Sequence, residues 1–94
     1  MGYHGAMAHI SQEEQQQKLS EAALKVPLGA RYVHYKNADR AYVITGHALL
    51  EATDEAAVIY TSDYGNRTPF IRPLSDFLAL VDVAGAQVPR FKKV

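Results

Sequence analysis

Two tyrosines, a histidine and two cations fall within six residues of this sequence, in the segment RYVHYK at residues 31–36. In a strand, Tyr32, His34 and Lys36 would share one face. An imidazole that titrates near neutrality could serve as a ligand contact or a general base. The alternative is a half-buried histidine that is hydrogen-bonded to the backbone or to a tyrosine. We favour this second interpretation, because no serine, cysteine or carboxylate in the sequence is tied to His34 as a catalytic partner.

A second candidate is Arg72, which lies between an isoleucine and a proline in an apolar segment. A guanidinium in such a place needs partners, because an unpaired buried charge is costly. A structural ion pair with Asp76 or Asp63 is the favoured interpretation. The alternative is a clamp for an anion or a phosphate, made together with Lys36 and Arg90.

Tyrosines are the main aromatic residues of the sequence, and five of them follow the first thirty residues: Tyr32, Tyr35, Tyr42, Tyr60 and Tyr64. In a small domain without tryptophan we expect most of them in the core or at its rim, with hydroxyls that reach solvent. The minority interpretation is a stacking platform for bases or another planar ligand.

Motifs for catalysis or metal binding are missing from the sequence. It has no cysteine, which excludes disulfides, thiolate metal sites and cysteine nucleophiles. His34 and His47 could form a metal pair, but a third ligand is not evident, and His4 with His9 would bind a metal only adventitiously. Paired carboxylates, a nucleophile elbow and a phosphate-cradling glycine loop are not found. We therefore expect no metal and no cofactor, and a binding role rather than catalysis.

Composition indicates one globular domain. The chain has 94 residues, of which 48% are apolar and 21% are charged. Ten basic residues balance ten acidic ones, so the cationic excess of a non-specific nucleic-acid binder is missing, although a local basic patch remains possible. Neither a membrane-spanning apolar run nor the pattern of a signal peptide is present. We expect a cytoplasmic protein.

A helix is predicted after a flexible lead-in of about ten residues. Ser11 and Glu14 have the spacing of a capping box, in which each side chain satisfies an N–H group of the first turn. Apolar residues then recur at helical spacing from Leu19 to Val26, and a proline and a glycine follow. The helix should pack only by its C-terminal half.

From residue 30 the apolar period becomes two, which is typical of strands. Strands are predicted at residues 31–36, 41–50, 57–62 and 69–73, turns at 37–40 and 63–68, a short helix near 73–80, a hairpin around Gly85 and a solvated basic tail at 90–94. Gly46 indicates a bulge or a close approach of backbone. Residues 47–57 could also form a short helix.

These elements predict a mainly β fold. It would be a small SH3-like, partly open β-barrel of four to five strands, with an N-terminal α-helix and a short helix near 73–80. Two parts are expected: residues 1–26, the lead-in and N-terminal helix, and residues 27–94, the barrel domain.

Four segments, in order, resemble one known family: ARYVHYKNADRAYVITGHA, AVIYTSDYG, FIRPLSDF and VPRF. Over residues 29–91 the sequence resembles the domain of unknown function 1653 family. It departs from the family pattern at Val33, where arginine is usual, and at Asn37, where glycine is usual; asparagine tolerates the left-handed backbone of a turn. The resemblance implies a small, mainly β domain and no particular activity.

Three functions follow as hypotheses. The first is a binding module for a small anionic or planar ligand, such as a nucleotide or a short single-stranded nucleic acid, held by Tyr32, His34, Lys36, Tyr60 and Arg72. The second is a protein-interaction or homodimerising domain that uses a strand edge and the N-terminal helix. The third is a small enzyme centred on His34.

Overall fold

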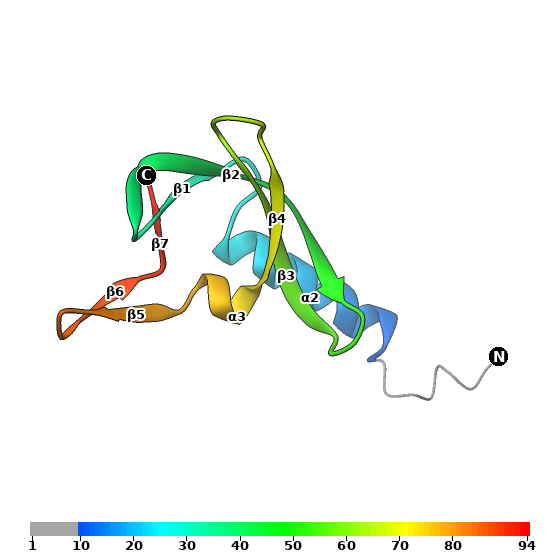
Figure 1. Ribbon diagram of the computed structural model, residues 1–94. Coiled ribbons are helices and arrows are strands. Elements are labelled where there is room, and N and C mark those ends of the chain that lie inside the picture. The colour runs from blue at the N-terminus through cyan, green and yellow to red at the C-terminus, as the bar shows by residue number, and fades with distance from the viewer. Residues whose placement is uncertain (1–9) are drawn as a thin grey trace.

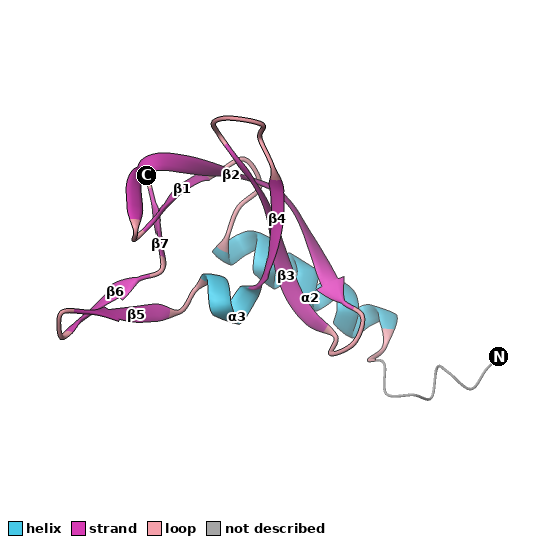
Figure 2. Cartoon of the chain, viewed as in Figure 1, coloured by secondary structure: helices cyan, strands magenta, loops and turns pink. Residues whose placement is uncertain are grey.

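The computed structural model describes residues 10–94, which form two helices and seven strands (Figures 1 and 2). In chain order these are α2 (Gln12–Lys25), β1 (Arg31–His34), β2 (Asn37–Leu50), β3 (Glu55–Ser62), β4 (Pro69–Pro73), α3 (Leu74–Phe77), β5 (Leu80–Val83), β6 (Ala86–Pro89) and β7 (Phe91–Lys93). Neither helix of this described part is long and apolar enough to span a membrane. The predicted lead-in and the histidines at positions 4 and 9 lie outside the described residues.

The predicted capping box opens α2. The Ser11 hydroxyl accepts a hydrogen bond from the Glu14 N–H, and the Glu14 carboxylate accepts one from the Ser11 N–H, both at 3.1 Å. At the other end, Ala22 and Val26 are fully buried. The prediction that the helix packs by its C-terminal half is therefore confirmed.

The large sheet has five antiparallel strands in the order β4-β3-β2-β1-β7, and β5 and β6 form a separate two-stranded sheet. The large sheet is strongly curved (Figure 1). It does not close into a barrel, because its two edge strands, β4 and β7, do not pair with each other. The mainly β fold with an N-terminal helix is confirmed. The five strands of the large sheet agree with the predicted four to five, and the β5–β6 hairpin adds two more. The SH3-like assignment remains a prediction.

The first hairpin is tighter than predicted. Residues 37–40, expected as a turn, belong to β2, and the chain reverses over Tyr35 and Lys36, because His34 already pairs with Asn37. The next pair joins Val33 to Ala41, so residues 38–40 lie at a shift of register between the two strands. The alternative helix at residues 47–57 is also wrong, since the end of β2 pairs there with β3. The predicted irregularity at Gly46 is confirmed as a bulge, where the register of β2 against β3 shifts.

The C-terminal region differs most from expectation. The helix expected near 73–80 is the single turn α3, because the residues after it extend into β5 and pair with β6 across a turn at Gly85. This hairpin reaches away from the large sheet (Figure 1). The tail was wrongly predicted to be only solvated: Phe91 is buried, and β7 pairs with β1. This pairing provides hydrogen-bond partners for the backbone of β1 and places the ring of Phe91 in the core.

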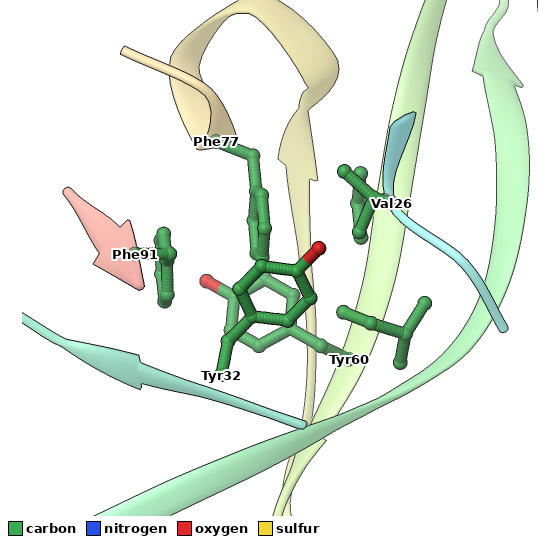
Figure 3. Close-up of a cluster of buried hydrophobic side chains, with 7 residues drawn as sticks. Val26, Tyr32, Tyr60, Phe77 and Phe91 are labelled. Carbon is green, nitrogen blue, oxygen red and sulfur yellow. The ribbon is translucent and has the colours of Figure 1, made fainter. Parts of the chain in front are cut away.

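The core lies between the concave side of the large sheet, α3 and the end of α2 (Figure 3). It consists of Val26, Tyr32, Ile44, Val58, Tyr60, Phe77 and Phe91. Tyr32 meets Phe77 edge to face, with ring centroids 5.2 Å apart. Tyr60 meets the same ring at 5.5 Å. The core placement expected for tyrosines is confirmed for these two.

Candidate functional site

A hollow of about 260 Å³ lies beside this aromatic core. Side chains from all five strands of the large sheet and from the β1–β2 turn line it: His34, Lys36, Asn37, Tyr42, Tyr60, Phe70, Arg72 and Phe91. Four of the five residues predicted for a ligand site, namely His34, Lys36, Tyr60 and Arg72, thus come together. The fifth, Tyr32, is not among the lining residues.

Strand register explains why these side chains meet. His34 pairs with Phe91 across β1 and β7, and Tyr60 pairs with Phe70 across β3 and β4. Directly paired residues point to the same face of a sheet, and so do residues two apart on one strand, such as Phe70 and Arg72. The curvature of the sheet then turns this face inward, which collects rings and cations around one hollow.

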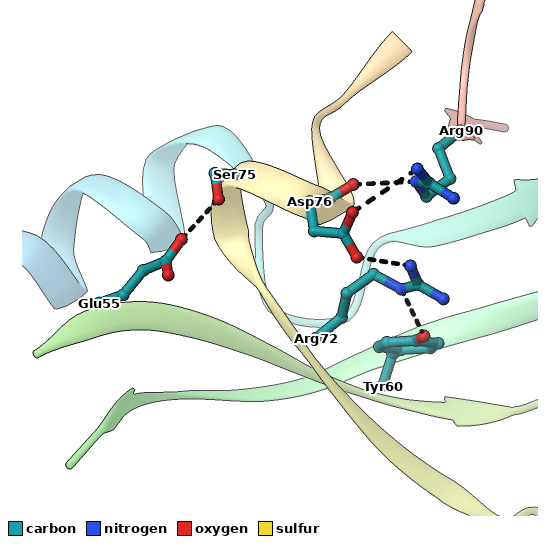
Figure 4. Close-up of polar contacts among 6 residues, drawn as sticks. All are labelled: Glu55, Tyr60, Arg72, Ser75, Asp76 and Arg90. Atoms are coloured by element: carbon teal, nitrogen blue, oxygen red, sulfur yellow. Dashed lines mark hydrogen bonds and ion pairs between the residues drawn. The ribbon is translucent and has the colours of Figure 1, made fainter. Parts of the chain in front are cut away.

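Arg72 connects the hollow to α3 (Figure 4). Its Nη1 donates to an Asp76 carboxylate oxygen at 2.6 Å, and its Nε donates to the Tyr60 hydroxyl at 3.3 Å. The guanidinium also lies 5.4 Å from the centre of the Phe91 ring. The predicted ion pair with Asp76 is confirmed. Within residues 10–94 the Nη2 of Arg72 has no hydrogen-bond partner, so it can still donate to a ligand.

The other acid considered for Arg72 was Asp63, and that alternative is wrong. Asp63 forms ion pairs with Arg31 and Arg67 instead. The hydrogen bond from Arg31, followed by its charge and the contact with Arg67, lowers the pKa of Asp63. This cluster ties β1 to the β3–β4 turn and lies apart from the residues that line the hollow.

Asp76 is shared between two arginines (Figure 4). Besides the bond to Arg72, its Oδ1 lies 3.6 Å from Nη2 of Arg90, whose Nε donates to the Asp76 backbone carbonyl at 3.2 Å. Arg90 is therefore part of an ordered network, and its prediction as a solvated end was wrong. One carboxylate for two guanidiniums leaves a positive excess, to which Lys36 adds.

His34 is half-buried in the wall of the hollow. Its Nδ1 accepts a hydrogen bond from the backbone N–H of Lys36 at 3.2 Å, and its ring meets the Phe91 ring edge to face at 5.0 Å. Burial lowers the pKa of His34, and the charges of Arg72, Arg90 and Lys36 lower it further. The imidazole is thus neutral at pH 7, with its proton on Nε2.

The backbone-bonded interpretation of His34 is therefore confirmed. In the part of the chain that the structure describes, neither a carboxylate nor a hydroxyl nucleophile forms a hydrogen bond to this ring. The hypothesis of an enzyme centred on His34 gains no support from its surroundings.

Tyr42 extends the aromatic wall. Its hydroxyl lies 3.2 Å from that of Tyr64, and this hydrogen bond, with burial, raises the pKa of Tyr42 to about 12. The bond with Tyr42, together with Arg40 whose guanidinium lies 4.7 Å from the ring centre, lowers the pKa of Tyr64. Phe70 contributes a further ring, which is 44% exposed.

Sequence reasoning did not assign four lining residues to the site: Asn37, Tyr42, Phe70 and Phe91. The alternation of β4 would have found Phe70, which lies two residues before Arg72. Phe91 could not be found in this way, because its position depends on a long-range pairing with β1.

The His34–His47 pair, considered above as a conceivable metal pair, is not arranged as a metal site. The Nε2 of His47 lies 2.6 Å from the carbonyl oxygen of Val26 and donates to it. Among residues 10–94, no three histidine, aspartate or glutamate side chains are grouped so that they could hold a metal ion.

Comparison with known proteins gave two matches. The family model described as "Protein of unknown function (DUF1653)" matches residues 30–93. The crystal structure of a DUF1653 protein from Bordetella bronchiseptica is 32% identical in sequence, covers 70% of this chain and 85% of that chain, and superposes with a TM-score of 0.59. The search of curated proteins gave no match. Both matches agree with the resemblance identified from the four sequence segments.

Proposed function

This chain belongs to the DUF1653 family of proteins of unknown function, and we propose that it is a binding module whose hollow takes a small, planar, anionic ligand. A nucleotide is the model ligand, and a terminal nucleotide of a short single strand would fit the same description. The observation that carries the proposal is the meeting of Arg72 and Lys36 with exposed aromatic edges in one hollow.

Charge is the first support. Arg72 and Lys36 line the hollow, and Arg72 shares the Asp76 carboxylate with Arg90. Three cations thus stand near one carboxylate, which gives the hollow a positive excess in a chain of zero net charge. The Nη2 group of Arg72 can still donate hydrogen bonds, although Nη1 is paired with Asp76. The guanidinium group is well suited to planar, bidentate recognition of carboxylates and phosphates. An anion that enters would replace water around groups already held in position.

The rings are the second support. Phe70 is partly exposed beside Tyr42, at ring centroids 6.3 Å apart, while Tyr60 and Phe91 are buried behind them. Stacking of a base on an aromatic side chain contributes about 1–3 kcal/mol and tolerates any base. Tyr32 has no part in this proposal, because its ring is packed into the core.

Size restricts the ligand. At about 260 Å³ the hollow lies just below the usual range of ligand pockets, which starts near 300 Å³. One nucleotide, or another ligand with one planar ring system and one anionic group, is therefore the appropriate scale. The zero net charge likewise argues against an extended nucleic acid, which would need a long basic track.

The test is the affinity for adenosine monophosphate in Arg72→Ala, with Arg67→Ala as the matched control. Both variants remove an arginine from an ion pair with an aspartate, but Arg67 lies outside the hollow. Loss of a charge-assisted hydrogen bond predicts at least about tenfold weaker binding for Arg72→Ala alone. Lys36→Gln, in an exposed turn, provides a second variant whose folding is not at risk. If Arg72→Ala leaves stability and affinity unchanged, the placement of the ligand is wrong.

A second candidate function is homodimerisation through the end of α2. Leu24 and Leu28 are 82% and 67% exposed, which is unusual for leucines on neighbouring turns of chain. A second copy could pair with the same patch across a twofold axis. Because the net charge of the chain is zero, overall charge repulsion between two copies would not oppose this contact. Truncating residues 1–26 would remove the buried Val26, so Leu24→Glu with light scattering is the sharper test. A dimer that this variant dissociates would favour the candidate; a wild-type monomer would exclude it.

A further inference from the structure

The hydrogen bond between His34 and Lys36 occupies a donor of the hollow. β1 ends at His34, β2 begins at Asn37, and the two-residue turn between them presents the Lys36 N–H to the imidazole Nδ1. Both residues line the hollow. The imidazole lone pair therefore accepts from an N–H group that a bound anion could also use.

His34 is surrounded mainly by cations. Arg72 of β4, Arg90 just before β7, and Lys36 in the turn all act on its ring through their charges. The acid near them, Asp76, is bound between the two arginines. The remaining faces of the imidazole meet the rings of Tyr35 and Phe91, at centroid distances of 4.7 and 5.0 Å. Around His34, three cations thus stand against one carboxylate.

We propose that His34 takes up a proton from solvent when an anion binds in the hollow, so that ligand binding is coupled to protonation of this imidazole. The inference rests on the proposed binding function and adds a coupling that anion binding alone does not require. The proton goes to Nδ1, the ring nitrogen without one. The Lys36 N–H can then no longer donate to that nitrogen, and both N–H groups become donors for the anion.

Electrostatics supports the direction of this change. Burial and the three cations disfavour a further positive charge and hold the pKa of His34 below its ordinary value of 6.5. A dianion neutralises these cations and reverses the local field, which raises the pKa of His34 in the complex. Because the bound form has the higher pKa, affinity rises as pH falls through that pKa and levels off below the pKa of the free protein.

The experiment is calorimetric titration with sulfate from about pH 5 to about pH 8. Sulfate is chosen because its charge is constant in this range, whereas a phosphate monoester itself titrates near pH 6. We expect an affinity that increases towards low pH by up to about tenfold per pH unit, the limit for one proton. Titrations in two buffers with different ionisation enthalpies should give a net uptake of up to one proton per sulfate.

His34→Gln is the decisive variant, because its amide oxygen can accept the Lys36 N–H but cannot be protonated in this range. It should bind sulfate no more tightly than the wild type does at about pH 8, and it should lose both the pH dependence and the proton uptake. Should the variant fail to fold, the imidazole NMR signals of the wild type give the same answer. Those of His34 should titrate at higher pH with sulfate present than without it.

Each outcome has one meaning. Sulfate binding without pH dependence overturns the coupling and leaves the binding function intact. Proton uptake that persists in His34→Gln also overturns it, since another group would then be the acceptor. Failure of both sulfate and adenosine monophosphate to bind at every pH overturns the proposed function, and the coupling with it.

Discussion

The ring of Phe77 lies flat on the ring of Phe91, with centroids 4.1 Å apart and planes only 4° from parallel. One ring comes from α3 and the other from β7, so this pair joins the single helical turn to the edge strand of the large sheet. Phe91 also lines the hollow and meets His34 and Arg72. The stacked pair thus holds the wall against which the proposed ligand would lie.

Phe77→Ala should strongly destabilise the fold. The side chain is 1% exposed and touches Tyr32, Tyr60 and Phe91. Truncating such a ring leaves a cavity, and we expect a loss of about 3–5 kcal/mol in the free energy of unfolding. Phe77→Leu, which fills more of the space, should lose less. Guanidinium unfolding measures both, and a loss below about 1 kcal/mol for alanine would show that α3 does not anchor the core.

Ala84→Asn should stabilise the β5–β6 hairpin. Its turn consists of Ala84 and Gly85, with φ angles of +53° and +87°. Two-residue hairpin turns with both central φ angles positive favour Asn-Gly, because asparagine adopts the left-handed region more readily than alanine. Amide hydrogen exchange in β5 and β6 should slow in Ala84→Asn and accelerate in Gly85→Ala. Equal exchange rates in the two variants would contradict this account of the turn.

Asp63 should contribute stability that depends on pH. Its pKa is lowered in the folded protein by the hydrogen bond and charge of Arg31 and by Arg67. Its contribution is therefore present above its ordinary pKa of 3.8 and is lost as pH falls through the lower, folded-state value. Asp63→Asn should be less stable than the wild type at neutral pH, and the difference should shrink in acid. The control variant is Asp39→Asn, because Asp39 is exposed. If its stability relative to the wild type changes with pH in the same way, the effect does not come from the ion pairs of Asp63.

Asp76→Asn should strengthen anion binding. Asp76 is the carboxylate that partly neutralises Arg72 and Arg90, so it competes with any anion in the hollow. We expect a several-fold gain in sulfate affinity. The cost in stability should be at most about 1 kcal/mol, because the Asp76 side chain is 42% exposed and solvent screens its pairs.

Asp82→Asn is the control for that gain, since it changes the net charge equally but lies on the β5–β6 hairpin. If both variants bind sulfate alike, overall charge rather than the hollow determines the affinity. Weaker binding in Asp76→Asn would mean that Asp76 matters chiefly by orienting Arg72.

Local sequence signals predicted the parts of the fold that depend on neighbouring residues. The capping box at Ser11 and Glu14, the bulge at Gly46 and the strand before Pro73 are of this kind. Residues 37–40 were misassigned because Asn and Asp favour turns, yet Asn37 pairs with His34 of β1 and residues 38–40 lie at a shift of register within β2. The strand β7 was not predicted, because its three residues, Phe91–Lys93, are too few to show a strand pattern of their own. They form a strand by pairing with β1, which is distant in the sequence.

The parts of the candidate site that depend on neighbouring residues were also predicted, and the parts that depend on long-range contacts were not. Alternation along β1 put His34 beside Tyr32, but it could not tell that the ring of Tyr32 would be buried under Phe77. The Arg72–Asp76 pair was predictable from its spacing of four residues. The second arginine on Asp76, Arg90, comes from fourteen residues further on and depends on the path of the β5–β6 hairpin.

The most direct test of the proposed binding site is an amide NMR titration of the wild-type protein with adenosine monophosphate. Separate titrations with adenosine, and with sulfate in place of the phosphate group, test the two parts of this ligand. We predict saturable shifts that cluster at residues 34–37 and 70–72, with the nucleotide binding more tightly than either half. Sulfate should affect Lys36 and Arg72 most, and adenosine should affect Phe70 most. Absence of saturable shifts at millimolar concentrations, or shifts centred on another surface, would contradict the assignment of this hollow as the ligand site.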